Sequence, residues 1–90
     1  MKVLIVEDDT LVSSFLSQTL VTGGHDCEVA RTGRNGLAVA EAGKSDVIVL
    51  DLNLPDITGF EVTELTRKRG DSTPILMLTA GVPRGMSPVA

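Results

Sequence analysis

The strongest constraint on the fold of this chain is a regular alternation of short apolar runs with longer segments of helical periodicity. The apolar runs lie at residues 3–6, 47–50 and 75–78, and residues 26–30 form a strand-like run in which apolar and charged residues alternate. The segments between them begin near residues of a type that caps helices, namely Thr10, Thr32 and Thr58. Strands that alternate with helices form βαβ units, in which the strands are parallel. The pattern therefore predicts one α/β domain built on a parallel sheet.

The composition of the four runs predicts their places in the sheet. Residues 3–6 and 47–50 are apolar throughout, which is typical of central strands buried on both faces. In residues 26–30, Cys27 and Val29 alternate with charged residues, as in an edge strand with one face in water. With right-handed crossover connections, we expect the strand order 2-1-3-4, counted along the chain.

The first two helices differ in how strongly the sequence predicts them. The first begins at about Thr10, with Asp9 or Thr10 as its N-cap. Its apolar residues recur at helical spacing and are expected to form one buried stripe: Leu11, Val12, Phe15, Leu16 and Leu20. The second helix is the weakest element, because Gly36 lowers its helix propensity.

Acidic side chains follow the two strands expected at the centre of the sheet. Glu7 and Asp8 come directly after the first strand, and Asp51 comes directly after the third. Open parallel sheets bind ligands beyond the carboxyl ends of their strands, where the strand order reverses. Three carboxylates crowded there need protons or a cation, and oxygen ligands with room for water favour Mg²⁺. Thr79, at the end of the fourth strand, adds a hydroxyl to the same edge.

A purely structural interpretation of these acids is the alternative. A single aspartate after a strand is commonly a turn or capping residue, and Asp9 alone carries no functional weight. Glu7 and Asp8 also suit the positive end of the dipole of the first helix. This interpretation does not predict acids and a threonine at the ends of three apolar strands, so we favour a ligand site.

Three motifs in these residues resemble one family. Residues 4–9 (LIVEDD) resemble the opening of a response regulator receiver domain, the phosphoacceptor of two-component signalling. Residues 51–59 (DLNLPDITG) resemble the phosphorylation loop of that family, and residues 74–80 (PILMLTA) resemble its fourth strand and the Thr-Ala pair that follows. The resemblance covers residues 2–80 and implies the flavodoxin-like receiver fold, with three layers and a parallel sheet of order 2-1-3-4.

The resemblance also implies a role for each matching residue. Asp51 is similar to the phosphoacceptor that takes a phosphoryl group from a histidine kinase or phosphotransfer protein. Glu7 and Asp8 are similar to the acidic pair that holds Mg²⁺ together with Asp51, and the backbone carbonyl of Asn53 would complete the protein ligands. Thr79 is similar to the switch residue whose hydroxyl contacts the phosphoryl group.

The chain departs from the family at its C-terminal end. Family members have a fifth strand, which ends in a lysine that pairs with the phosphoryl group, and final helices. We expect residues 1–80 to form a receiver domain without these elements and residues 81–90 to form an irregular tail. Phosphorylation and switching are then expected to be impaired, and the open edge of the fourth strand is expected to join two chains as a homodimer.

Two other functions are considered beside the phosphoacceptor. The first is a receiver-like interaction module that dimerises without being phosphorylated, which the lack of the family's lysine favours. The second is a small Mg²⁺-dependent phosphohydrolase with an aspartyl nucleophile. Such enzymes carry a second aspartate two residues after the nucleophile, where this chain has Asn53. We therefore expect a signalling domain rather than an enzyme.

The composition excludes several kinds of partner. The chain of 90 residues has a net charge of −4 and only two aromatic residues, Phe15 and Phe60, so we expect no direct binding of nucleic acid. Its strand-like apolar runs are too short to span a membrane. The single cysteine, Cys27, excludes an intramolecular disulfide and fits a cytoplasmic location.

Overall fold

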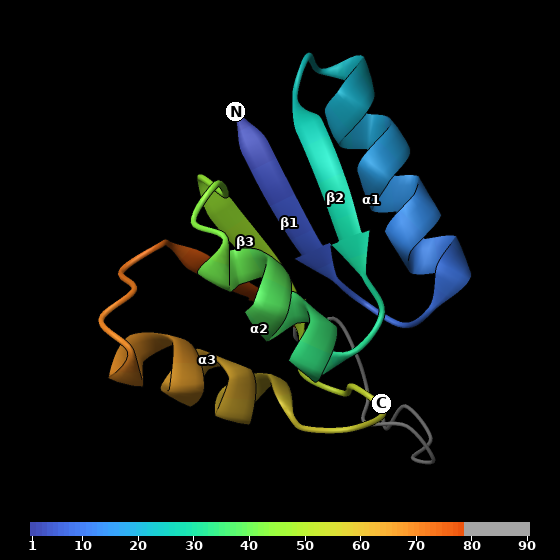
Figure 1. Cartoon of the computed structure of the whole chain (residues 1–90). Coiled ribbons are helices and arrows are strands. Elements are labelled where there is room, and N and C mark those ends of the chain that lie inside the picture. The colour runs from blue at the N-terminus through green and yellow to red at the C-terminus, as the bar shows by residue number, and fades with distance from the viewer. Residues whose placement is uncertain (79–90) are drawn as a thin grey trace, which may run out of the picture.

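A computed structural model describes residues 1–78 of the chain and confirms the predicted architecture (Figure 1). The described residues form a four-stranded parallel sheet of order β2-β1-β3-β4. The elements are β1 (Lys2–Val6), α1 (Thr10–Thr22), β2 (Asp26–Ala30), α2 (Gly33–Glu41), β3 (Val47–Asp51), α3 (Gly59–Lys68) and β4 (Ile75–Leu78). The predicted domain boundary at residue 80, the tail at 81–90 and the site residue Thr79 lie outside the described residues.

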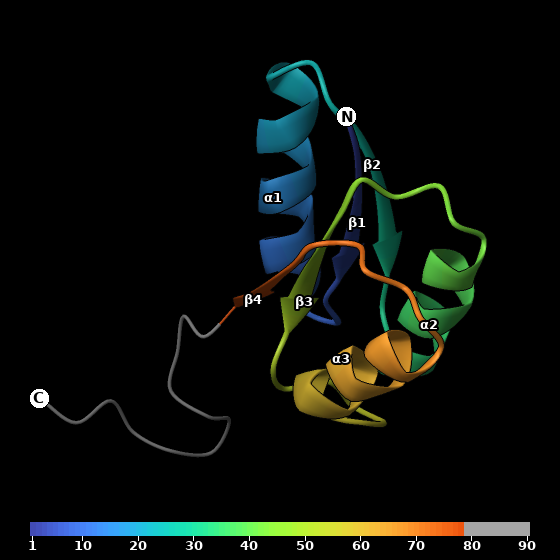
Figure 2. The ribbon, with the colours of Figure 1, turned by 90° about the vertical axis from the view of Figure 1, so that its left-hand side faces the viewer.

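The helices cover the two faces of the sheet unequally (Figure 2). Helix α1 lies on one face, whereas α2 and α3 lie together on the other. Successive side chains of β1 and β3 point to opposite faces, so each of the two strands contributes to two cores. Leu4, Val6 and Leu50 pack with Val62 on the side of α2 and α3, and Ile5 packs on the side of α1.

None of the three helices described crosses a membrane: each is too short or too polar.

The predicted buried stripe of α1 is wrong in part. Leu16 and Leu20 pack against the sheet, but Leu11 is 83% exposed, Phe15 69% and Val12 38%. The five apolar positions spread over about half of the helix circumference, because each residue turns the helix by about 100°. The sheet buries only the side that carries Leu16 and Leu20. The apolar pattern therefore marked a surface wider than the one that is covered.

Gly36 has a packing role that the sequence did not reveal. It lies in α2, where the helix crosses close to β1, and it is buried. A Cβ atom at this position would lie 2.7 Å from Cγ2 and 2.9 Å from Cγ1 of Val6. Real Cβ atoms do not approach carbon so closely, so α2 can lie this near to β1 only because residue 36 has no side chain.

We expect Gly36→Ala to destabilise the protein by about 1–3 kcal/mol, because overpacking against Val6 exceeds the gain in helix propensity of about 1 kcal/mol. Urea denaturation measures the difference in the free energy of unfolding. Ala38→Gly, at an exposed position of the same helix, is the matched control and reports the propensity difference alone. A Gly36→Ala variant as stable as the parent would contradict the close approach.

Candidate functional site

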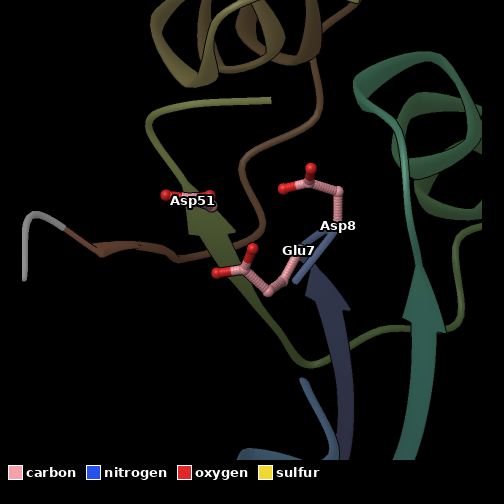
Figure 3. Close-up of side chains that lie close together, drawn as sticks. All are labelled: Glu7, Asp8 and Asp51. Atoms are coloured by element: carbon pink, nitrogen blue, oxygen red, sulfur yellow. The ribbon is translucent and has the colours of Figure 1, made fainter. Parts of the chain in front are cut away.

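The structure brings three acidic side chains together at the carboxyl ends of two neighbouring strands (Figure 3). Glu7 and Asp8 directly follow β1, and Asp51 is the last residue of β3. Because β1 and β3 are paired and parallel, the carboxyl ends of both strands lie at the same end of the sheet. One carboxylate oxygen from each residue lies within 4.8 Å of the other two. We call these three residues the acidic cluster.

The donor set of the acidic cluster suits a hard divalent cation. All three side chains offer carboxylate oxygens, the ligands that Mg²⁺ prefers. Opposite ligands of an octahedral Mg²⁺ ion lie about 4.2 Å apart. The three carboxylate oxygens, within 4.8 Å of one another, thus lie on the scale of one Mg²⁺ coordination shell, and their chemistry fits Mg²⁺.

Glu7 carries the clearest electrostatic signature of the acidic cluster. Its side chain is only 4% exposed. Burial raises the pKa of Glu7 to about 7, although a hydrogen bond from the backbone of Asp9 works in the opposite direction. The negative charge of Asp51, a hydrogen bond with the Asp51 side chain and the charge of Asp8 also contribute to this rise. Near neutral pH the cluster therefore favours either a proton on Glu7 or a cation.

Backbone hydrogen bonds hold the acidic cluster in place. The N–H of Glu7 donates to the carbonyl of Ala30 at 2.9 Å, which ties the end of β1 to the end of β2. The N–H of Asp9 donates to Oε2 of Glu7 at 2.9 Å. Asp9 is the N-cap of α1, since its side chain accepts from the N–H groups of Leu11 and Val12. Of the two predicted N-caps, Asp9 and Thr10, the structure thus confirms Asp9.

The other predicted site residues differ in where they lie relative to the acidic cluster. Asn53 adjoins the acidic cluster, because its N–H donates to Oδ1 of Asp51 at 3.2 Å. Its role as a metal ligand stays a prediction, and Thr79 lies outside the described residues. The lysines are remote: Lys2 begins β1, Lys68 ends α3, and Lys44 lies in the connection that leads to β3. These lysines thus lie at the end of the sheet opposite the acidic cluster.

Asp56 is a residue near the site that the sequence did not identify. It lies in the loop after Asp51, and its carboxylate accepts hydrogen bonds from the N–H groups of Gly33 and Arg34 at 2.8 and 3.0 Å. Desolvation opposes ionisation, but hydrogen bonds from the backbone, those of Arg34 and Gly33 first among them, outweigh it and lower the pKa of Asp56. No short-range signal predicts this contact, because the partners are more than twenty residues apart.

Comparison with known sequences relates the chain to one family. The profile described as the response regulator receiver domain matches residues 3–86. The transcriptional regulatory protein TcrA of Mycobacterium tuberculosis is 39% identical over 79 residues, which cover 88% of this chain and 31% of TcrA. The transcriptional regulatory protein CusR of Escherichia coli is 39% identical over 80 residues, which cover 89% of this chain and 35% of CusR. The chain thus spans about a third of the length of these relatives.

Solved structures give the same relationship. The chemotaxis protein CheY4 of Vibrio cholerae superposes with a TM-score of 0.82 at 40% identity, covering 92% of this chain and 71% of CheY4. The response regulator TrrA of Thermotoga maritima, solved in complex with Mg²⁺-BeF, superposes with a TM-score of 0.83 at 30% identity, covering 89% of this chain and 70% of TrrA.

The expectation that nucleic acid is not a partner gains no support, because the relatives TcrA and CusR are transcriptional regulators.

Proposed function

The chain belongs to the response regulator receiver domain family, and from this premise we propose that it accepts a phosphoryl group on Asp51 with the help of Mg²⁺. The donor is a phosphohistidine of a histidine kinase or phosphotransfer protein. The observation that carries the proposal is the convergence of Glu7, Asp8 and Asp51 at the carboxyl end of the sheet, where one carboxylate oxygen of each lies within 4.8 Å of the others. We propose that the domain spans residues 1–80.

The proposed reaction transfers a phosphoryl group from an imidazole nitrogen of the donor to a carboxylate oxygen of Asp51. A carboxylate oxygen of Asp51 attacks phosphorus, and an acyl phosphate bond forms while the bond from phosphorus to the donor's imidazole nitrogen breaks. The nitrogen keeps the electron pair. When bound, Mg²⁺ would neutralise charge on the phosphoryl oxygens, and Glu7, Asp8, Asp51 and the backbone carbonyl of Asn53 would hold it. The hydroxyl of Thr79 would contact a phosphoryl oxygen and report that the site is occupied.

Two observations support this assignment. The donor set of the acidic cluster is made of oxygens alone, and burial together with the neighbouring carboxylates raises the pKa of Glu7 to about 7, so the cluster favours a cation. The relative TrrA was solved in complex with Mg²⁺-BeF. We further propose that the chain takes up one phosphoryl group per molecule rather than acting as an enzyme. A cytoplasmic location is part of the proposal and is consistent with the free thiol of Cys27.

Incubation with acetyl phosphate and Mg²⁺, followed by intact mass spectrometry, tests the proposal. We expect the mass to increase by one phosphoryl group, and chelation of Mg²⁺ to abolish the increase. NMR titration with Mg²⁺ is the companion measurement, and the amide signals of residues 7, 8 and 51 should shift. If neither the adduct nor the shifts appear, the phosphoacceptor function is ruled out and an unphosphorylated interaction module is favoured.

A second proposal concerns association of two chains through β4. Among the described residues, β4 pairs with β3 alone, and Leu76 is 60% exposed although it lies in the sheet. Apolar strand edges of this kind favour pairing with another strand. We propose a homodimer formed by this edge, with or without phosphorylation.

Leu76→Glu tests the homodimer, because a charge on this strand would be buried in the interface. We expect sedimentation equilibrium at micromolar concentration to show a dimer for the parent chain and a monomer for the variant. Phe60→Glu is the control: Phe60 is similarly exposed, at 65%, but it lies in α3. A folded parent chain that sediments as a monomer would rule out the dimer.

A further inference from the structure

The loop that follows Asp51 is closed by hydrogen bonds at both ends. Residues 52–58 connect β3 to α3 and carry Asn53. At the start of the loop, the N–H of Asn53 donates to Oδ1 of Asp51 at 3.2 Å. At its base, the N–H of Gly59 donates to the carbonyl of Leu52 at 2.9 Å. Both contacts are local, so they leave open what holds the middle of the loop.

The middle of the loop is held by Asp56, which reaches the N-terminus of α2. Oδ1 of Asp56 accepts from the N–H of Gly33 at 2.8 Å, and Oδ2 accepts from the N–H of Arg34 at 3.0 Å. Nε of Arg34 lies 4.0 Å from Oδ2. Thr32, the N-cap of α2, accepts from the N–H of Asn35 at 3.0 Å. Asp56 therefore satisfies the first two N–H groups of α2, which the cap residue does not reach.

Apolar packing next to Asp56 fixes the distance between the loop and α2. A Cβ atom on Gly33 would lie 2.5 Å from Cγ1 of Ile57 and 2.9 Å from Cγ2 of Val62. The absence of a side chain at Gly33 thus lets Ile57 lie directly against the start of α2. Leu54 and Ile57 both pack against the core between the sheet, α2 and α3. The loop is held by a charged contact and by an apolar contact side by side.

We infer that Asp56 is a positioning residue for the phosphoacceptor site: by binding the N-terminus of α2, it holds the loop that places Asn53 beside Asp51. Hydrogen bonds to an ionised carboxylate are about twice as strong as neutral ones, so this contact restrains the loop more than a neutral cap would. The effect on metal binding rests on the proposed function. The restraint of the loop does not.

The test compares Asp56→Ala with Asp56→Asn and with a matched control, Asp71→Ala. Asp71 also accepts two hydrogen bonds, from the N–H and the hydroxyl of Thr73 at 2.9 and 2.6 Å, and it also lies near an arginine, Arg69. It precedes β4, at the end of the sheet opposite the acidic cluster. The Asp71→Ala variant therefore measures the effect of removing a hydrogen-bonded aspartate without disturbing residues 52–58.

Two readouts decide the outcome. In Asp56→Ala, the dissociation constant for Mg²⁺ should rise about tenfold, as is usual when a group that orients a metal ligand is removed. Amide hydrogen exchange at Asn53 and Gly59, measured without metal, should accelerate by about tenfold relative to the control. Asp56→Asn retains one acceptor oxygen and should recover part of both effects.

The result that overturns the inference is a folded Asp56→Ala protein whose exchange at Asn53 and Gly59 equals that of Asp71→Ala. Faster exchange with an unchanged Mg²⁺ dissociation constant would also overturn the positioning role. If the parent chain does not bind Mg²⁺, the proposed function fails on its own. The exchange comparison in the metal-free protein then still decides whether Asp56 holds the loop.

Discussion

Replacement of Asp51 with asparagine is expected to reduce phosphoryl uptake from acetyl phosphate to background. An amide oxygen is a far weaker nucleophile than a carboxylate oxygen and cannot form the acyl phosphate. Asparagine has nearly the same shape, and its Oδ1 can still accept the hydrogen bond from the N–H of Asn53. The variant should therefore keep the fold. Intact mass spectrometry after incubation with acetyl phosphate and Mg²⁺ measures the loss.

The matched control for this prediction is Asp26→Asn. Asp26 is an exposed aspartate at the start of β2, at the end of the sheet opposite the acidic cluster. This control should take up as much phosphate as the parent chain. Uptake by Asp51→Asn at the parental level would show that another group is the acceptor, and peptide mapping of the adduct would identify it.

Glu7→Gln is expected to stabilise the metal-free protein at pH 8 by on the order of 2–3 kcal/mol, measured by urea denaturation. In the folded protein the pKa of Glu7 is about 7, above its ordinary value of 4.5. The folded state therefore binds the proton more tightly than the unfolded state does. This contribution to stability is fully present below pH 4.5 and is lost as the pH rises through 7. Glutamine is neutral throughout, so the variant should lack this decline.

Addition of Mg²⁺ at pH 8 should make the parent chain more stable than Glu7→Gln. A cation compensates the crowded charges of the parent chain, so its melting temperature at pH 8 should rise. Glu7→Gln offers one carboxylate fewer and should gain much less. Glu64→Gln, at an exposed position of α3, is the control and should match the parent chain with and without Mg²⁺. A Glu7→Gln protein less stable than the parent at pH 8 without metal would contradict the raised pKa of Glu7.

The strand order and the caps could be predicted because short-range patterns determine them. The apolar runs predict β1 and β3 to within a residue at each end, and β2 and β4 without error. Thr32 and Thr58 cap α2 and α3 as their positions before glycine and apolar residues indicate. The preference of βαβ units for right-handed crossovers then leaves one arrangement of the sheet. In that arrangement Glu7, Asp8 and Asp51 lie at one edge.

The exposed part of α1 and the role of Gly36 could not be predicted in the same way. Helical spacing reveals which residues share a side of a helix, but it does not reveal how wide a surface the neighbouring sheet covers. Leu11 and Phe15 are apolar and exposed because they lie beyond that surface. Propensity marks Gly36 as a weak point of α2, whereas the approach of Val6 makes the same glycine necessary for packing.

The sequence by itself determined the α/β fold, the order of its strands and the edge at which the acids gather. These follow from local periodicity, capping and the handedness of crossovers, all of which act over a few residues or one connection. Only the tertiary structure decided the burial that raises the pKa of Glu7, the close contact of α2 with β1 and the contact of Asp56 with α2. Each of these depends on the distance between groups far apart in the chain, and packing of the whole domain sets that distance.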